Sequence, residues 1–279
     1  MHLPVIEDIE DPILARALQH KLDHKTKPLG SLGRIERLAL QLGLILGSES
    51  PRLEQPQLVV CAADHGLATR GVSAYPRDVT WQMVENFLAG GAAVSVLARQ
   101  HGLALTVVDC GVARDVVAPG SPDGTRPGLL VRKCAAGTAD ALEEVAMSDA
   151  QCEQAITHGR ELLRGLPGNA VLLGEMGIGN TSAASMLMAR LMDLDIAQCT
   201  GAGTGLDAQA LARKTAVLAA VLEHHRQARA PLQALAAFGG FEIATLVGVV
   251  LEAARQRRVV VVDGFITTAA VLGGQALAP

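Results

Sequence analysis

The chain has 279 residues, enough for one large domain or two small ones with an ample hydrophobic core. Hydrophobic residues make up 49% of the chain and charged residues 19%, a balance typical of globular proteins that excludes a disordered or collagen-like chain. The 24 Lys and Arg residues against 28 Asp and Glu give a net charge of -4 with no basic run, so we predict no nucleic-acid partner.

The five cysteines are odd in number and lack the spacing of a metal site, so we predict reduced thiols, no bound metal and a cytoplasmic protein. The N-terminal residues carry several acids and lack the basic and apolar regions of a signal peptide. The most apolar long stretch, residues 234–254, contains Glu242, Glu252 and glycines, so no membrane span is expected.

Short runs of Val and Leu alternate with longer segments of helical spacing along the chain. The apolar runs are typical of strands buried on both faces, and they begin at Leu58, Leu105, Ala170 and Val259. Helices are predicted over 78–101, 149–166, 207–229 and 242–255, the first three with N-caps at Asp78, Asp149 and Asp207. The alternation predicts an α/β fold with a mainly parallel sheet.

Two segments rich in glycine and proline, 47–57 and 117–128, are predicted to be surface loops. The piece that precedes the first of them is set apart from the first strand. We therefore assign residues 1–46 to an N-terminal helical segment of a small domain and residues 47–279 to an α/β domain.

The strongest local motif is a buried strand that enters a glycine-rich turn and then an alanine-rich helix opened by Asn180 and Thr181. Gly177 and Gly179 let the backbone approach a ligand, and the free N–H groups of a helix N-terminus favour phosphate. The spacing matches neither GxGxxG nor a Walker A loop, and an ordinary capped turn is the alternative on spacing alone. Glu175 favours a binding site, because it follows a buried strand at the edge where parallel sheets bind ligands.

A second glycine cluster precedes the predicted helix that carries Lys214. Gly203, Gly205 and Lys214 are candidates to complete a phosphate site. Taken by itself, however, Lys214 is interpreted as a solvated lysine on an exposed helix face.

Residues 62–84 follow the first strand and concentrate polar and aromatic side chains. Tyr75 and Gln82 are placed to recognise a flat heterocycle, and simple packing at a helix start is the alternative. Asp64 and His65 are adjacent, so on an extended segment they point in opposite directions, and a structural turn is favoured over an acid–base pair.

Residues 259–271 partly resemble the loop of phosphoribosyl-diphosphate-dependent transferases, in which two acids precede a Thr-Thr-Gly turn. Here Asp263 is followed by Gly264, and Thr268 is followed by Ala269. This turn therefore lacks both the second acid and the glycine.

Read in order, several segments resemble the nicotinate-nucleotide:dimethylbenzimidazole phosphoribosyltransferase family. The blocks that carry the resemblance are KTKPLGSLGRIERLA from Lys25, AADHG from Ala62, GVSAYPRDVTWQMVENFLAGGAAVSVLAR from Gly71, VVDCGV from Val107, GEMGIGNTS from Gly174, GTGLD from Gly203, GGFEIA from Gly239 and VVDGFI from Val261. Their combined order is more specific than any single glycine motif.

The resemblance implies a doubly wound, mainly parallel Rossmann-like sheet flanked by helices, a small helical subdomain from the chain ends, and a homodimer. It implies a pentosyltransferase that moves the ribose phosphate of nicotinate mononucleotide to 5,6-dimethylbenzimidazole. The products are α-ribazole 5'-phosphate and nicotinate, in cobalamin nucleotide-loop assembly. Nicotinate leaves from a positively charged pyridinium nitrogen that becomes neutral, so no cofactor or metal is expected.

The resemblance also implies roles for single residues. Glu175 matches the glutamate beside the reacting centre and is the catalytic candidate. Ser73, Tyr75 and Gln82 match the benzimidazole pocket. The positions that match the nucleotide phosphate and ribose are Gly177, Ile178, Gly179, Asn180, Thr181, Gly203, Thr204, Gly205, Lys214 and Asp263.

The resemblance implies a longer chain that ends in a Gly-Glu-Gly segment whose glutamate is the general base. In this sequence the last glutamate is Glu252, so residues 47–279 are expected to be a nucleotide- and base-binding domain truncated at its C-terminal end. One alternative is a missing piece supplied by another chain, and another is an impaired protein that binds the same ligands. A remote alternative is an NAD-dependent dehydrogenase, in which Asp193 or Asp195 would bind ribose.

Overall fold

The computed structural model describes residues 2–116, 128–203 and 205–279. The predicted loop over 117–128 thus lies outside the described residues except for Gly128, and the predicted site residue Thr204 lies outside them as well.

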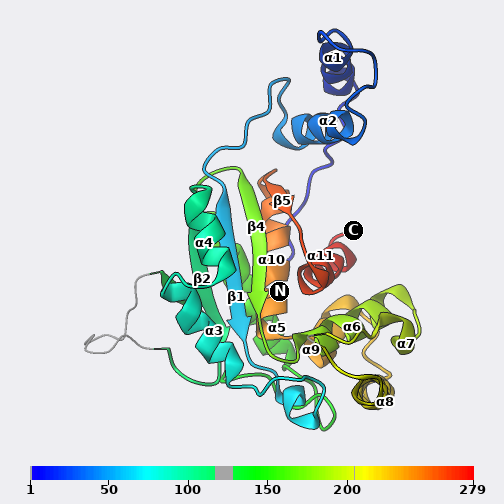
Figure 1. Ribbon diagram of the computed structural model, residues 1–279. Coiled ribbons are helices and arrows are strands. Elements are labelled where there is room, and N and C mark those ends of the chain that lie inside the picture. The colour runs from blue at the N-terminus through cyan, green and yellow to red at the C-terminus, as the bar shows by residue number, and fades with distance from the viewer. Residues whose placement is uncertain (1, 117–127, 204) are drawn as a thin grey trace.

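Within the described residues, five parallel strands form one sheet in the order β3-β2-β1-β4-β5 (Figure 1). The strands are β1 (Gln57–Ala63), β2 (Ala104–Gly111), β3 (Leu129–Val131), β4 (Ala170–Met176) and β5 (Val259–Val261). With β1 central and the chain stepping outward on both sides, this is the order of a doubly wound sheet. The predicted α/β fold class is confirmed. The three-residue strand β3 was not predicted.

Helices connect the strands and continue beyond both edges of the sheet. They are α1 (Pro12–Asp23), α2 (Arg34–Leu46), α3 (Val79–Leu88), α4 (Ala93–Gln100), α5 (Asp149–Gly165), α6 (Asn180–Met192), α7 (Ile196–Cys199), α8 (Ala208–His224), α9 (Pro231–Phe238), α10 (Phe241–Arg255) and α11 (Phe265–Leu277), with a short 3-10 helix η1 at Gly66–Arg70. No helix in the described ranges is both long enough and apolar enough to cross a membrane.

Two details of the predicted helices were wrong. The segment 78–101 forms two helices, because Gly90 between them takes a left-handed φ of 77° that ends α3. The N-cap of α5 is Ser148 rather than Asp149, in a capping box with Gln151. Asp207 does cap α8, through a hydrogen bond from the backbone N–H of Ala210.

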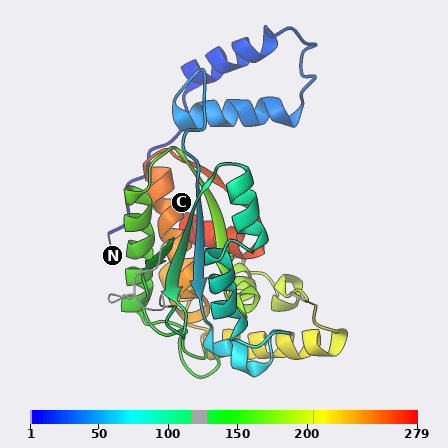
Figure 2. The same ribbon diagram turned by 60° about the vertical axis from the view of Figure 1, so that its left-hand side comes forward.

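The sheet separates two apolar layers. Helices α5 and α10 cover one face and α3 and α4 the other, as Figures 1 and 2 show from two sides. Strand β1 is buried throughout: Val59, Cys61 and Ala63 belong to the layer under α5 and α10, and Val60 and Ala62 to the layer under α3. This alternation is the expected side-chain period of a strand with both faces covered.

Helices α5 and α10 approach closely through two glycines. A Cβ atom on Gly159 would lie 1.9 Å from the carbonyl oxygen of Thr245, and one on Gly248 would lie 2.0 Å from that of Ile156. Neither position accepts a larger residue unless the helices separate.

Helices α1 and α2 form a hairpin beyond the amino-terminal edge of the sheet (Figure 2). Arg257, just before β5, donates from Nε to the carbonyl oxygen of Ile45 and from Nη2 to that of Leu44, at 3.0 and 2.6 Å. It thereby satisfies the last carbonyl groups of α2. The helices predicted within residues 1–46 are present, while the division into two domains stays a prediction.

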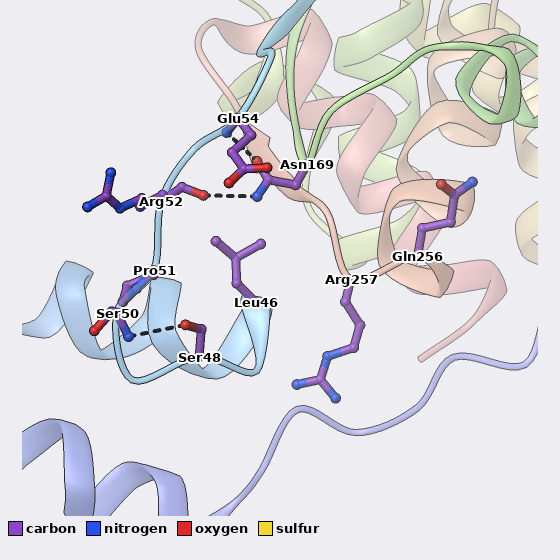
Figure 3. Close-up of a pocket in the computed structure, with 9 residues that line it drawn as sticks. All are labelled: Leu46, Ser48, Ser50, Pro51, Arg52, Glu54, Asn169, Gln256 and Arg257. Atoms are coloured by element: carbon purple, nitrogen blue, oxygen red, sulfur yellow. Dashed lines mark hydrogen bonds between the residues drawn. The ribbon is translucent and has the colours of Figure 1, made fainter.

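A cavity of about 370 Å³ lies where the hairpin meets this edge (Figure 3). Its walls include Arg52, Glu54 and Asn169, and the Asn169 side chain joins the carbonyl of Arg52 to the N–H of Glu54. Because ligands of parallel sheets bind at the carboxyl edge, this cavity lies at the wrong end of the strands for the predicted site.

Candidate active site

The carboxyl ends of β1 and β4 bring the main predicted residues together. These strands are neighbours, and Glu175 pairs with Cys61 in their register. Asp64 and His65 follow β1 directly, while the turn at Gly177 follows β4 and leads into α6. This is the edge at which a doubly wound sheet binds its ligands.

Glu175 lies half-buried at the end of β4 and accepts a hydrogen bond from the side-chain amide of Asn180. Burial raises the pKa of Glu175 to about 7, against the opposing effect of the Asn180 hydrogen bond, and the carboxylate of Glu242 adds to the rise. A carboxyl group that titrates near neutral pH is suited to accept or donate a proton.

The turn between β4 and α6 is tightly packed against the end of β1. A Cβ atom on Gly177 would lie 2.7 Å from the carbonyl oxygen of Ala63, and Gly179 has a left-handed φ of 95°. The N–H of Ile178 donates to Thr80 Oγ1 at 3.1 Å. Among the described side chains none caps α6. The N–H groups of Asn180 and Ser182 donate to the carbonyl oxygens of Gly177 and Gly179, at 3.1 and 2.9 Å, so the helix start favours an anion through the positive end of its dipole.

Lys214 reaches the same turn from α8. Its side chain is 1% exposed, and Nζ donates to Thr181 Oγ1 at 2.9 Å and, at 3.4 Å, to the carbonyl oxygen of Gly201. Gly203, with a left-handed φ of 57°, lies beside this ammonium group. Both hydrogen-bond partners are uncharged, and burial lowers the pKa of Lys214. The interpretation of Lys214 as a solvated lysine is wrong.

A second pair of ionisable groups lies behind Glu175. His65 and Glu242 are both buried, and His65 Nε2 lies 2.7 Å from Glu242 Oε1. Burial lowers the pKa of His65, but Glu242, together with Asp64 and Glu175, more than offsets this and raises the pKa above its ordinary value.

The sequence interpretation missed this pair. It assigned His65 to a structural turn and gave Glu242 no role. The available signal was a glutamate two residues after a Gly-Gly pair, at the start of a helix that is mostly apolar.

The predicted base-pocket residues lie near the start of α3. Ser73 and Tyr75 precede this helix and Gln82 lies within it. Tyr75 is 52% exposed and Gln82 is exposed too, while the N–H of Tyr75 donates to Ser73 Oγ at 3.3 Å. Helix α3 packs against β1, β2 and β4, so these residues adjoin the sheet that carries Glu175, and their role stays a prediction.

Asp263 lies two residues beyond the end of β5, the edge strand next to β4, and its role stays a prediction. Strand β5 pairs with the first part of β4, where Val261 lies opposite Leu172, and the exposed Asp263 follows it.

The two acids that a dehydrogenase would use to bind ribose lie instead at the ends of helices. Asp193 takes the left-handed C-cap of α6 and Asp195 caps α7, so that alternative is not favoured.

Comparison with known proteins agrees with the fold and identifies the family. A family model described as phosphoribosyltransferase matches residues 8–279. The chain is 69% identical over 277 residues to the nicotinate-nucleotide–dimethylbenzimidazole phosphoribosyltransferase of Variovorax paradoxus (strain S110), covering 99% of this chain and 77% of that protein. It is 54% identical to the protein of the same name from Ralstonia nicotianae, covering 96% of this chain and 75% of that one.

A solved structure is similar as well. The crystal structure of CobT from Thermus thermophilus matches with a TM-score of 0.88 and 38% identity, covering 96% of this chain and 79% of that one. The family model, the relatives and the similar structure each match nearly the whole chain, and this chain therefore belongs to the nicotinate-nucleotide–dimethylbenzimidazole family of phosphoribosyltransferases.

Proposed function

We propose that this enzyme transfers the ribose phosphate of nicotinate mononucleotide to 5,6-dimethylbenzimidazole, giving α-ribazole 5'-phosphate and nicotinate. The observation that carries the proposal is the pair of charged groups on one turn. Glu175, with a pKa of about 7, precedes the turn, and the buried ammonium group of Lys214 contacts its far end at Thr181. Glu175 is suited to accept a proton, and Lys214 is suited to bind an anion.

The phosphate of the nucleotide binds at the N-terminus of α6. There the helix dipole favours negative charge, and Lys214 supplies a full positive charge that has no acidic hydrogen-bond partner in the described chain. The glycines at 203 and 205 leave room for the phosphate and ribose beside the ammonium group. A bound phosphate would compensate the buried cation.

The transfer forms one bond and breaks one bond at the anomeric carbon. A benzimidazole nitrogen attacks this carbon from the face opposite nicotinate, while the bond to the pyridinium nitrogen breaks and its electron pair stays on that nitrogen. Nicotinate thus leaves without receiving a proton. The second benzimidazole nitrogen loses its proton to the carboxylate of Glu175, which then releases it to solvent.

The incoming base lies between the start of α3 and the end of β4, against Ser73, Tyr75 and Gln82. The exposed face of Tyr75 is available for stacking on a flat ring, and the Gln82 amide can hydrogen bond at its edge.

The proposal includes a homodimer in the cytoplasm with no nucleic-acid partner. The net charge of -4 supports the last point, and unpaired cysteines support a reducing compartment. Apolar side chains exposed on α6 and α11, such as Met192 and Phe265, support an interface between copies. Light scattering coupled to size-exclusion chromatography tests the dimer.

A turnover assay tests the function. The chain is incubated with nicotinate mononucleotide and dimethylbenzimidazole, and nicotinate and α-ribazole phosphate are separated by chromatography. We expect equal amounts of both products, a loss of about 100-fold in kcat for Glu175→Gln, and no loss for Glu223→Gln, an exposed carboxylate on α8. Nicotinate release without α-ribazole phosphate, or full activity of Glu175→Gln, would contradict the proposal.

A further inference from the structure

The buried pair His65 and Glu242 has no part in the transfer step described above. Glu242 is 0% exposed and His65 is 3% exposed, and they come from opposite ends of the chain, 177 residues apart. Their 2.7 Å contact is the single hydrogen bond of the Glu242 side chain in the described structure, because Glu242 Oε2 has no partner there. A buried carboxylate is costly without a charged partner, so this contact favours a protonated imidazole.

Two glycines make room for the pair against the active-site turn. A Cβ atom on Gly177 would lie 3.2 Å from Glu242 Oε1 and 3.3 Å from His65 Cδ2, and one on Gly240 would lie 2.4 Å from His65 Cε1. Gly177 is two residues beyond Glu175, so the imidazole is packed directly against the turn that presents the proposed base.

We propose that His65 and Glu242 form a positioning ion pair, in which Glu242 holds a protonated imidazole beside the turn after β4 so that its positive charge faces the Glu175 carboxylate. This inference deepens the proposed function and rests on it. Neither residue is required to touch substrate. Their part is to keep Glu175 ionised, and therefore able to accept the benzimidazole proton, near neutral pH.

The charged groups around the imidazole explain why a positive charge is needed at this position. His65 is surrounded by three carboxyl groups: Asp64 from the end of β1, Glu175 from β4 and Glu242 from α10. Arg77, before α3, lies 3.8 Å from Asp64. From α6, the neutral side chain of Asn180 contacts Glu175.

His65 is thus the charged group that acts on both Glu175 and Glu242. Burial and Glu242 raise the pKa of Glu175, and His65 opposes them. Without the imidazolium, Glu175 would hold its proton to higher pH.

Two substitutions separate the charge of the pair from its hydrogen bond. His65→Gln removes the positive charge but keeps an N–H donor that holds the Glu242 carboxylate, so the pKa of Glu175 rises. Glu242→Gln removes the negative charge, and the buried imidazole then becomes neutral. The Glu242 carboxylate, which raises the pKa of Glu175, and the imidazolium, which lowers it, then disappear together. The pKa of Glu175 therefore moves less than in His65→Gln.

Histidine NMR tests the charge state directly and does not depend on turnover. The His65 ring signals, assigned by their loss in His65→Gln, are followed over about pH 5 to 9. We expect imidazolium shifts through neutral pH in the unaltered chain and neutral-imidazole shifts in Glu242→Gln. A neutral His65 in the unaltered chain at pH below about 7 would overturn the proposal.

A titration of Glu175 tests the positioning role. The carboxyl carbon of Glu175, assigned by Glu175→Gln, is titrated by ¹³C NMR, and kcat is measured over the same pH range. For His65→Gln we expect the Glu175 titration and the acidic limb of kcat to move together to higher pH. Near neutral pH kcat falls about 10-fold and recovers in alkali.

The control is His158→Gln, which removes a half-buried imidazole bonded to the carbonyl oxygen of Arg132 and leaves both curves in place. A uniform loss of kcat in His65→Gln, with the Glu175 titration unmoved, would assign the pair a merely structural role and overturn the proposal. If His65→Gln does not fold, Glu242→Gln, which keeps the imidazole, is judged by the histidine signals. A Glu175 titration that moves as expected while Glu175→Gln keeps full turnover would refute Glu175 as base and leave the ion pair standing.

Discussion

Lys214→Met is expected to weaken nucleotide binding while leaving the fold as stable as before or more so. Lys214 is 1% exposed, and its ammonium group donates only to a hydroxyl and a carbonyl oxygen. Methionine has a similar length and needs no solvation, so the loss of two weak hydrogen bonds is offset by removal of a buried charge. We expect a free energy of unfolding between unchanged and about 1 kcal/mol higher.

Whereas Lys214→Met leaves stability unchanged or higher, it weakens binding of the nucleotide. A charge-assisted hydrogen bond to phosphate contributes about 1.5 to 3 kcal/mol, so KM for nicotinate mononucleotide should rise about 10- to 150-fold. The matched control is Arg213→Met, which removes the same charge from the neighbouring exposed position on α8 and should leave KM unaltered.

The pH dependence gives a second measure of the same group. The pKa of Lys214 is lowered by burial from its ordinary value of 10.5, so in the alkaline window below that value the folded state binds fewer protons than the unfolded state. Stability from this residue therefore increases as pH rises through the window. Thermal melting of the unaltered chain and of Lys214→Met across that window should show the increase only in the former. An unchanged KM, with Lys214→Met and Arg213→Met indistinguishable, would refute this account.

Three further substitutions test the packing, the charge network and a helix cap. Gly159→Ala places a methyl group 1.9 Å from a carbonyl oxygen of α10 and should lower the free energy of unfolding in urea by about 2 kcal/mol; Gly165→Ala, which meets nothing within 4 Å at the end of the same helix, should not. Burial raises the pKa of Glu252, but hydrogen bonds from surrounding arginines outweigh it and hold the value at about 2, so stability from Glu252 is lost as pH falls from about 4.5 through 2. Glu252→Gln should flatten acid melting curves over that range, and an unchanged slope would contradict the network's role. Ser148→Ala removes the cap of α5 and should cost about 1 kcal/mol in the same urea assay, with no change speaking against the capping box.

The sheet could be predicted because its signal is local. A strand buried on both faces is a short run of branched apolar residues, and four such runs begin at or one residue after the starts of β1, β2, β4 and β5. Strand β3 has three residues, none of them buried, so no pattern distinguishes it from a loop. The break between α3 and α4 depends on the backbone conformation of Gly90, which periodicity does not reveal.

The candidate site was predictable only where its residues share one segment. Glu175, Gly177 and Asn180 lie on a single turn, so a local motif identifies them together. Lys214 on its own looks like any helical lysine, and only the packing of α8 against α6 buries it. Glu242 was missed because its partner, His65, lies far away in the sequence. No local spacing indicates that a buried glutamate contacts a distant histidine.

The distance in sequence between His65 and Glu242 also has a consequence for synthesis of the protein. At about 5 to 20 residues per second, the 177 residues between them take about 10 to 35 s to translate. During that interval β1 can pair with β2, but the histidine at its end lacks the Glu242 carboxylate and the face of the sheet that α10 covers is open. The contact between His65 and Glu242 can therefore form only after most of the chain has been made.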